Sequence, residues 1–302
     1  MRFANDGAAE QQYLDLIDEI LDHGQLRADR TGVGTIAIHG ATMRFDLSDG
    51  CVPLLTTKKT AWKLAVKELL WFLTGETNIS ALLQAGVHIW SDWPHQKYVQ
   101  ATGDEISMAE FEQRIVGDPA FAERWGDLGP VYGAQWRRWE GKDGKVYDQI
   151  SALVEQIKAN PGSRRLLFHA WNVAEIDEMA LPPCHLLYQY FVSQGRLSCT
   201  LYQRSVDVGL GLPFNIVAAS VLLRMLAQQC DLEAGELFWV GHDVHIYSNH
   251  TESLRLQRTR TPKPFPKLEI ARRPASIFDY RIEDFSMRGY ESHPHIAMAV
   301  AV

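Results

Sequence analysis

The sequence predicts a mixed α/β fold, in which helices and strands share one hydrophobic core. The chain has 302 residues, of which 46% are hydrophobic and 22% charged, so it can bury a substantial core. Segments of helical and of strand periodicity both occur along it. No internal repeat, low-complexity linker or obvious domain boundary divides the sequence.

Four segments have the apolar spacing of helices: residues 9–23, 61–74, 147–159 and 215–230. Gly75 is expected to end the second, because glycine readily takes the left-handed conformation found after helix ends. Asn215 is the expected N-cap of the fourth, since its side chain can accept a backbone hydrogen bond.

Strands are predicted for residues 34–47, 165–172, 186–192 and 196–203. The last two flank Ser193, Gln194 and Gly195. This short turn contains glycine and predicts a hairpin.

Composition restricts the class of protein. The formal net charge of −7 disfavours broad electrostatic binding to nucleic acid or anionic lipid. The four cysteines form no Cys-x-x-Cys pair, which predicts free thiols and neither a disulfide framework nor a metal site. No run approaches the roughly 20 apolar residues of a membrane span. The N-terminal residues lack a secretory pattern, so we expect a cytoplasmic protein.

Arginines beside hydroxyl residues or other arginines are the first candidate for a binding site. Neither a P-loop nor a complete G-x-G-x-x-G motif is present. Arg30 lies in DRTG, Arg164 and Arg165 in SRR, and Arg204 in QRS. Each alone is most simply a solvated surface charge. Together they could surround a phosphate, whose oxygens match the guanidinium fork.

Glu68 is unusual because helical spacing aligns it with Leu64 and Phe72. A carboxyl group on this apolar stripe would be poorly solvated, and burial would raise its pKa towards values suited to proton transfer. A structural carboxylate, bonded to backbone, arginine or lysine, explains the pattern equally well.

Cys184 stands in LPPCHLLYQY, where two prolines favour an extended backbone and place the thiol at the start of a strand. Strand alternation would send Cys184 and His185 to opposite faces, so their adjacency does not indicate a catalytic pair. A nearby arginine could lower the thiol pKa. Cys199 and Cys230 look like packing residues, and an inert buried cysteine is the commoner alternative for Cys184 too.

The chain resembles the folate-dependent thymidylate synthase family over nearly its whole length. The shared motifs, in the family's order, are DRTGVGT, ELLWFLTGETNI, GDLGPVYGAQWR, SRR with AWNV, MALPPCH, LYQRSVDVGLGLPFN, HIYSNH and SIFDYRIEDF. The resemblance implies an α+β fold, with a large mixed β-sheet that is covered by helices and packs back to back in a homodimer. It also implies one domain over residues 1–302, with a variable insertion at about 94–125 to which we assign no function.

The implied reaction converts dUMP and 5,10-methylenetetrahydrofolate into dTMP and dihydrofolate. The folate is a co-substrate that donates both the carbon and the hydride, and no metal takes part. Cys184 matches the family nucleophile, which adds to C6 of uracil and makes C5 reactive.

The resemblance also assigns the groups that bind dUMP. Those expected at the phosphate are Arg30, Arg204, Ser205 and the pair Arg164 and Arg165, the pair coming from the partner subunit. Arg204 is also expected near the thiol. Those expected to organise water and proton transfers around the base are Glu68, Tyr132 and His185. Asn215 would bind the pyrimidine edge, and His245 and Tyr247 the sugar 3′-hydroxyl.

The folate side is assigned in the same way. Asp207 would bond the pterin ring, and Trp90 and Trp93 would pack beside the folate. The C-terminal residues Ala301 and Val302 would close over it.

Three departures from the family pattern concern folate affinity and proton relays. His169 and His242 stand where many members have small residues, and Ala61 stands where some have histidine. Both histidines are expected to be ordinary packed residues.

Two other functions are alternatives to the implied reaction. A pyrimidine-nucleotide hydroxymethylase of the same family would let water, in place of hydride, react with the methylene carbon. A nucleotide- or RNA-binding protein without activity is disfavoured by the presence of Cys184, Glu68 and Asn215 and by the acidic balance.

Overall fold

The computed structural model describes residues 8–300. The two residues expected to close over folate, Ala301 and Val302, lie outside this range. The contacts among the described residues divide them into two compact units. Unit 1 comprises residues 8–66, 153–167 and 184–300, and unit 2 comprises residues 67–152 and 168–183.

Unit 1 is built on a six-stranded sheet of order β1-β2-β8-β7-β6-β5. Its strands are β1 (Gln25–Arg27), β2 (Thr35–Asp46), β8 (Glu233–Tyr247), β7 (Arg196–Asp207), β6 (His185–Ser193) and β5 (Leu167–His169). β7 and β8 are parallel, whereas β1 with β2, β2 with β8, and β6 with β7 are antiparallel. The predicted α+β class with a large mixed sheet is confirmed.

The hairpin predicted around Ser193 is confirmed. Ser193 pairs with Arg196, and the two residues between them, Gln194 and Gly195, have φ values of 50° and 73°. Positive φ at both central positions is the geometry of the tight turn that matches the twist of paired strands. The turn therefore fixes the register of β6 against β7.

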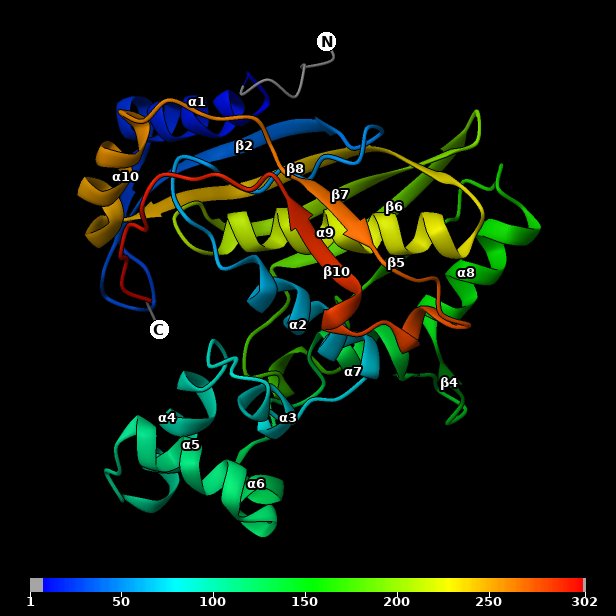
Figure 1. The fold of residues 1–302 in the computed structure, drawn as a ribbon. Helices are drawn as coiled ribbons and strands as arrows, with labels where there is room; N and C mark the ends of the chain where they lie inside the picture. The colour runs from blue at the N-terminus through cyan, green and yellow to red at the C-terminus, as the bar shows by residue number, and fades with distance from the viewer. Residues whose placement is uncertain (1–7, 301–302) are drawn as a thin grey trace. The chain divides into compact units, whose positions relative to one another are not determined.

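Helix α9 (Gly211–Gln229) connects the parallel strands β7 and β8 and lies along one face of the sheet (Figure 1). Among residues 8–300 it is the one helix whose length and composition would suit a membrane span. However, 67% of its apolar window is buried inside the protein, as is usual for a core helix.

The prediction that Asn215 caps α9 is wrong. The helix begins at Gly211, four residues earlier, and Asn215 lies in its second turn. Asp207 Oδ1 accepts the backbone N–H groups of Gly209 and Leu210, so the chain turns before the helix starts. Pro213 fits in the first turn because the N–H it lacks has no partner within the helix there.

Helix α1 (Ala8–His23) packs on β2 and on α10 (Thr251–Arg258). Its Glu10 side chain is completely buried, and its two carboxylate oxygens accept four hydrogen bonds. The donors are the backbone N–H and the hydroxyl groups of Thr56 and Thr57, at 2.5–2.9 Å. Gln257 of α10 donates in turn to the Thr57 hydroxyl at 2.8 Å. One carboxylate therefore holds α1, the segment around residue 56 and α10 together.

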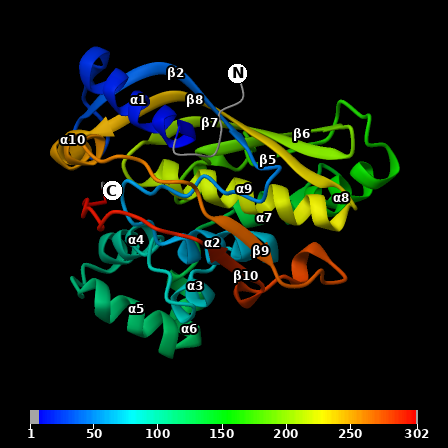
Figure 2. The ribbon, with the colours of Figure 1, turned by 45° about the horizontal axis from the view of Figure 1, so that its top comes forward.

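The remaining strands of unit 1 form a separate antiparallel pair, β9 (Lys267–Ile270) with β10 (Phe285–Arg288), which Figure 2 shows below α9. Short 3₁₀ helices occur at Ser248–His250, Ile277–Asp279 and Ile282–Asp284.

Unit 2 is mainly helical. It contains most of α2 (Trp62–Thr74), together with α3 (Ser80–Gln84), α4 (Asp92–Thr102), α5 (Met108–Gly117), α6 (Pro119–Trp125), α7 (Tyr132–Arg137), the pair β3 (Trp139–Glu140) and β4 (Val146–Tyr147), and a 3₁₀ turn at Ile176–Glu178. α8 (Gln149–Ala159) begins in unit 2 and ends in unit 1. Gly75 follows α2 with φ 83°, as predicted.

The segment expected to be a variable insertion folds as helices α4, α5 and α6. Their aromatic side chains contact one another at ring separations of 5.2–5.8 Å, through Tyr98, Phe111, Phe121 and Trp125. Phe111 is completely buried. This segment thus has a small core of its own.

Helix periodicity correctly located α1, α2 and α8, and the four predicted strands correspond to β2, β5, β6 and β7. Strand β5 is shorter than expected, because it covers only Leu167–His169. The fifteen-residue strand β8 was not predicted.

We predict that Glu10→Ala lowers the free energy of unfolding by about 3 kcal/mol or more, because four buried donors lose their acceptor. Glu19→Ala is the matched control, since Glu19 is exposed on the same helix and its loss should change stability by less than about 0.5 kcal/mol. Urea unfolding measures both. Equal midpoints for the two variants would contradict the structural role given to Glu10.

Candidate active site

Cys184 differs from the other three cysteines in its exposure. Cys51, Cys199 and Cys230 are buried, whereas Cys184 is partly exposed, directly before β6. All four are free thiols. The backbone N–H of Arg204 donates to the Cys184 carbonyl at 2.9 Å, and Arg204 Nη2 lies 3.9 Å from the Cys184 sulfur. The strand-start position and the neighbouring arginine predicted for this thiol are therefore both present.

The balance of charge and burial at the thiol differs from the sequence expectation. Burial raises the pKa of Cys184 above its ordinary value of 9.0, and Asp207 adds to this. Arg204 and Arg30 act in the opposite direction but do not outweigh burial. The thiol is thus mainly protonated at neutral pH, and the two arginines favour the thiolate whenever the proton leaves.

His185 is buried, and its Nδ1 lies 3.0 Å from the Tyr188 hydroxyl. Burial lowers its pKa from 6.5 to about 3. His185 is therefore a neutral imidazole, which can exchange hydrogen bonds but does not carry a positive charge.

Arg30 lies in a turn that Asp29 organises. The carboxylate of Asp29 accepts the Thr31 hydroxyl at 2.7 Å and the backbone N–H of Gly34 at 3.0 Å. Arg30 and Arg204 both act on the Cys184 thiol, so these two predicted phosphate ligands face the same part of unit 1.

Arg164 and Arg165 lie elsewhere on the sheet. Both are exposed, in the loop before β5, which is one edge of the sheet. Arg30 follows β1, the opposite edge. The backbone beside Arg164 and Arg165 meets the middle of β6, because Tyr190 N–H donates to the Leu166 carbonyl at 2.7 Å and Gln189 Nε2 donates to the Arg164 carbonyl at 3.4 Å. Gln189 is five residues along β6 from Cys184, roughly 16 Å at about 3.3 Å per residue. Arg164 and Arg165 thus lie along β6 from the thiol and not beside it.

Two predicted sugar ligands lie at the end of β8. His245 is buried, and its Nδ1 is 3.1 Å from Asp243 Oδ1, while Arg27 pairs with the other oxygen of Asp243. A carboxylate can only accept, so Nδ1 carries the proton and Nε2 is left as an acceptor. The Tyr247 ring stands edge-on to His245, with 5.2 Å between ring centres.

Asp207 lies at the end of β7, beside His245 in the parallel register. Burial acts to raise its pKa, but the hydrogen bond and charge of His250, the charge of His245 and the Leu210 N–H together hold that pKa below its ordinary value. His250 Nδ1 is 3.7 Å from Asp207, and its Nε2 donates to the carbonyl of Ala299 at 2.6 Å. His250 therefore links the predicted pterin ligand to the C-terminal segment. Sequence reasoning quoted the HIYSNH motif but did not single out this histidine.

The amide of Asn215 is also held within unit 1. Gln203 Nε2 donates to Asn215 Oδ1 at 2.9 Å. Ser205 pairs with Asp243 in the register of β7 and β8, close to the other groups at these strand ends.

A second group of predicted residues gathers within unit 2. Glu68 is buried, and Trp90 Nε1 donates to its carboxylate at 2.7 Å. Phe72 contacts both Trp90 and Tyr132, and Trp93 packs on Trp90 with 5.3 Å between ring centres. Burial raises the Glu68 pKa from 4.5 to about 7, although the Trp90 bond opposes this rise. The buried, proton-binding carboxyl expected from the sequence is confirmed.

The three departures lie in different surroundings. His169 packs on Trp139 with 5.0 Å between ring centres, and burial lowers its pKa, so the expectation of a packed residue is confirmed. His242 is exposed and contacts His39 edge-on at 4.8 Å, so that expectation is wrong for His242. The reason is that its neighbour on β2, His39, is itself exposed, so the two rings contact each other at the protein surface. Ala61 is exposed.

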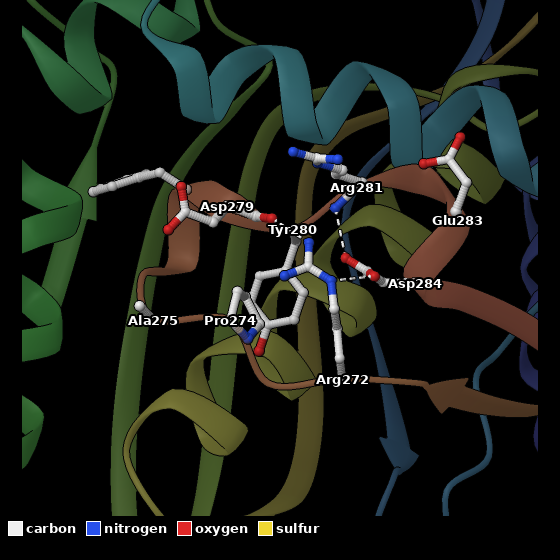
Figure 3. A pocket seen from close by; sticks show the side chains of 9 residues that line it. Arg272, Pro274, Ala275, Asp279, Tyr280, Arg281, Glu283 and Asp284 are labelled. Atoms are coloured by element: carbon white, nitrogen blue, oxygen red, sulfur yellow. Dashed lines mark hydrogen bonds and ion pairs between the residues drawn. The ribbon is translucent and has the colours of Figure 1, made fainter.

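Another hollow in unit 1 contains none of the predicted residues. It is lined by Arg272, Pro274, Ala275, Phe278, Asp279, Tyr280, Arg281, Glu283 and Asp284 (Figure 3). Asp284 accepts from Arg272 Nε at 2.6 Å and from the backbone N–H of Arg281 at 2.8 Å. The Asp284 carboxylate at the centre of this hollow is thus already hydrogen-bonded within the protein. Over residues 8–300, no group of three or more His, Cys, Asp and Glu side chains could hold a metal ion.

Comparison with known proteins identifies the family of the chain. The family model described as thymidylate synthase matches residues 11–302. A thymidylate synthase of Cereibacter sphaeroides is 62% identical over 97% of this chain and 99% of its own length. Those of Rhodopseudomonas palustris and Zymomonas mobilis are 61% and 59% identical over 97% of this chain, and over 99% and 100% of their own lengths. The chain therefore belongs to the thymidylate synthase family.

Proposed function

We propose that this chain catalyses the reductive methylation of dUMP to dTMP, with 5,10-methylenetetrahydrofolate as the donor of carbon and hydride and dihydrofolate as the second product. The observation that carries the proposal is the setting of Cys184. The cysteine that matches the family nucleophile is the partly exposed one of the four, and a guanidinium group lies 3.9 Å from its sulfur.

Cys184 provides the nucleophile. Its sulfur bonds to C6 of uracil while the C5–C6 electron pair moves towards O4, which leaves C5 as a carbon nucleophile. Arg204 and Arg30 stabilise the thiolate and bind the phosphate, because both favour negative charge at this position. The folate, when bound, supplies the one-carbon group and then the hydride.

The other groups bind and orient the nucleotide. Asn215 bonds the pyrimidine edge, His245 accepts the sugar 3′-hydroxyl through Nε2, and Tyr247 bonds the same hydroxyl. Neutral His185 and the Glu68 carboxyl, whose pKa of about 7 lets it hold or release a proton, serve the proton transfers together with Tyr132. The folate contacts are assigned to Asp207, Trp90, Trp93, Ala301 and Val302.

The active form is a homodimer that shares its phosphate sites. The place of Arg164 and Arg165 supports this, since their loop meets β6 at Gln189, about 16 Å along the strand from Cys184 in the same subunit. Phe191 of β6 is 68% exposed beside a hollow that Arg44 and Phe238 also line, which supports sheet-to-sheet packing of two subunits.

The four free thiols support a reducing, cytoplasmic location. We propose further that both units act as one catalytic domain, in which residues of about 94–125 are an insertion. Synthase activity is favoured over hydroxymethylase activity, because the relatives that match nearly the whole chain are named thymidylate synthase.

We expect wild-type protein to form dTMP and dihydrofolate in equal amounts, without added nicotinamide or flavin. Cys184→Ala should lose turnover at least about a thousandfold yet still bind dUMP, because the covalent step disappears. Cys230→Ala, at the end of α9, is the control and should keep most activity. Dihydrofolate absorbance and product mass spectrometry measure this. If wild type forms mainly 5-hydroxymethyl-dUMP, the synthase assignment is wrong and the hydroxymethylase assignment takes its place.

We expect Glu68 to bind a proton near neutral pH. Between pH 4.5 and about 7 the folded protein retains a proton that the unfolded chain has lost, so this group's contribution to stability falls as pH rises. Wild type should therefore lose up to about 3 kcal/mol relative to Glu68→Gln over this range, at about 1.4 kcal/mol per pKa unit. Glu76→Gln, at an exposed site, retains Glu68 and should follow the wild-type profile. Parallel stability profiles for wild type and Glu68→Gln would disprove the raised pKa.

We expect mixed dimers to reveal the shared site. Arg165→Ala and Cys184→Ala subunits are each inactive alone, but their hybrid holds one intact site, so an equal mixture should recover roughly a quarter of wild-type activity. Arg30→Ala mixed with Cys184→Ala is the control. Arg30 and Cys184 act within one subunit, so this mixture should stay inactive. No recovery in the first mixture after verified subunit exchange would refute the shared arginines.

A further inference from the structure

A chain of hydrogen bonds connects Trp239 of β8 to Asn215 of α9 through Gln203 of β7. The indole Nε1 of Trp239 donates to Gln203 Oε1 at 2.6 Å, and Gln203 Nε2 donates to Asn215 Oδ1 at 2.9 Å. Trp239 is completely buried, and Gln203 is 1% exposed. Water therefore has little access to the first two members.

The direction of this chain is fixed at its buried end. An indole N–H can only donate, so Gln203 must turn its oxygen towards Trp239. The Gln203 amino group then faces Asn215, and Asn215 must turn its oxygen towards Gln203. The orientation of one amide thus sets that of the next.

The position of the indole ring is itself constrained. A Cβ atom at Gly241 would lie 2.5 Å from two carbon atoms of the Trp239 ring, so only glycine allows the ring to occupy this place. Gly241 pairs with Gln203 across the two parallel strands. Gly241, opposite Gln203, therefore leaves the space for the Trp239 ring, and this ring orients the Gln203 amide.

We propose that Trp239 and Gln203 are positioning residues that select uracil over cytosine by fixing the amide orientation of Asn215. The inference rests on the proposed function, in which Asn215 bonds the pyrimidine edge. With its orientation fixed, Asn215 offers the second lone pair of Oδ1 to the N3–H of uracil and its amino group to O4.

Cytosine presents the reverse pattern, with an acceptor at N3 and an amino group at C4. Asn215 can match cytosine only by rotating its amide. Its amino group would then face the amino group of Gln203, and neither Gln203 nor Trp239 can rearrange without leaving a buried donor unsatisfied. The discrimination is therefore built into residues that do not touch the base.

The decisive variant is Gln203→Glu. A carboxylate accepts from both the Trp239 indole and the Asn215 amino group, so both hydrogen bonds remain while the Asn215 amide is turned round. We expect the ratio of kcat/KM for dUMP to that for dCMP to fall by roughly a hundredfold or more at pH 8, where the introduced carboxyl is ionised. Competition binding of the two nucleotides should shift in the same direction.

Two further variants test the same orienting role if Gln203→Glu does not fold. Trp239→Phe keeps the ring but removes the N–H, and Gln203→Met removes the amide. Each should lower the dUMP preference roughly tenfold or more by releasing Asn215. Trp71→Phe is the matched control, because Trp71 is also buried and its indole nitrogen has no hydrogen-bond partner among the described residues. It should retain the wild-type ratio.

The outcomes separate this inference from the proposed function. If wild type prefers dUMP and Asn215→Asp loses that preference, while folded Gln203→Glu, Gln203→Met and Trp239→Phe all keep it, the orienting role of Gln203 and Trp239 is refuted and the function stands. If wild type forms no dTMP, the proposed function itself fails. A reversal in Gln203→Glu together with a loss in Trp239→Phe would establish the role.

Discussion

The parallel pairing of β7 with β8 is the constraint on which the candidate site depends. Parallel neighbours cannot be joined by a tight turn, so the chain must cross over the sheet, and here α9 makes that crossing. The crossing places Asn215 beneath the sheet, and the register sets Asp207 beside His245 at the carboxyl ends of the two strands. Ligands of open α/β sheets bind at such ends. One strand pairing therefore collects groups that are about 40 residues apart in sequence.

Burial and charge have competing effects on the pKa values of the candidate site residues, and the net shift differs from residue to residue. At Cys184 burial outweighs two arginines, so the resting group is a thiol. At Asp207 the histidines His250 and His245 and the Leu210 N–H together outweigh burial, so the carboxylate stays ionised. At Glu68 burial raises the pKa to about 7, although the hydrogen bond from Trp90 opposes this rise. Burial and charge thus leave a neutral thiol and a carboxylate anion in unit 1, and a carboxyl group that can exchange protons in unit 2.

Local sequence patterns predicted the features that depend on neighbouring residues. Periodicity located α1 and α2, a glycine turn located the β6–β7 hairpin, and the prolines before Cys184 located its strand start. The patterns failed where contacts between segments that are distant in sequence determine the structure. Strand β8 was missed because its ladder to β2 joins residues far apart in sequence. Gln203 reads as an ordinary strand residue, and only the fold shows that its amide lies between an indole and Asn215.

The ladder between β2 and β8 also affects how the chain is made. Thr35 pairs with Tyr247 and Asp46 with Glu236, so strand β2 is complete about 200 residues before its partner exists. At roughly 5–20 residues per second on the ribosome, that interval lasts on the order of 10–40 s. During this time the N-terminal segment has only local partners, and its alternating apolar face is open to other nascent chains and to chaperones. Native pairing of β2 with β8 must therefore begin late in synthesis, once about four fifths of the chain, through Tyr247, has emerged.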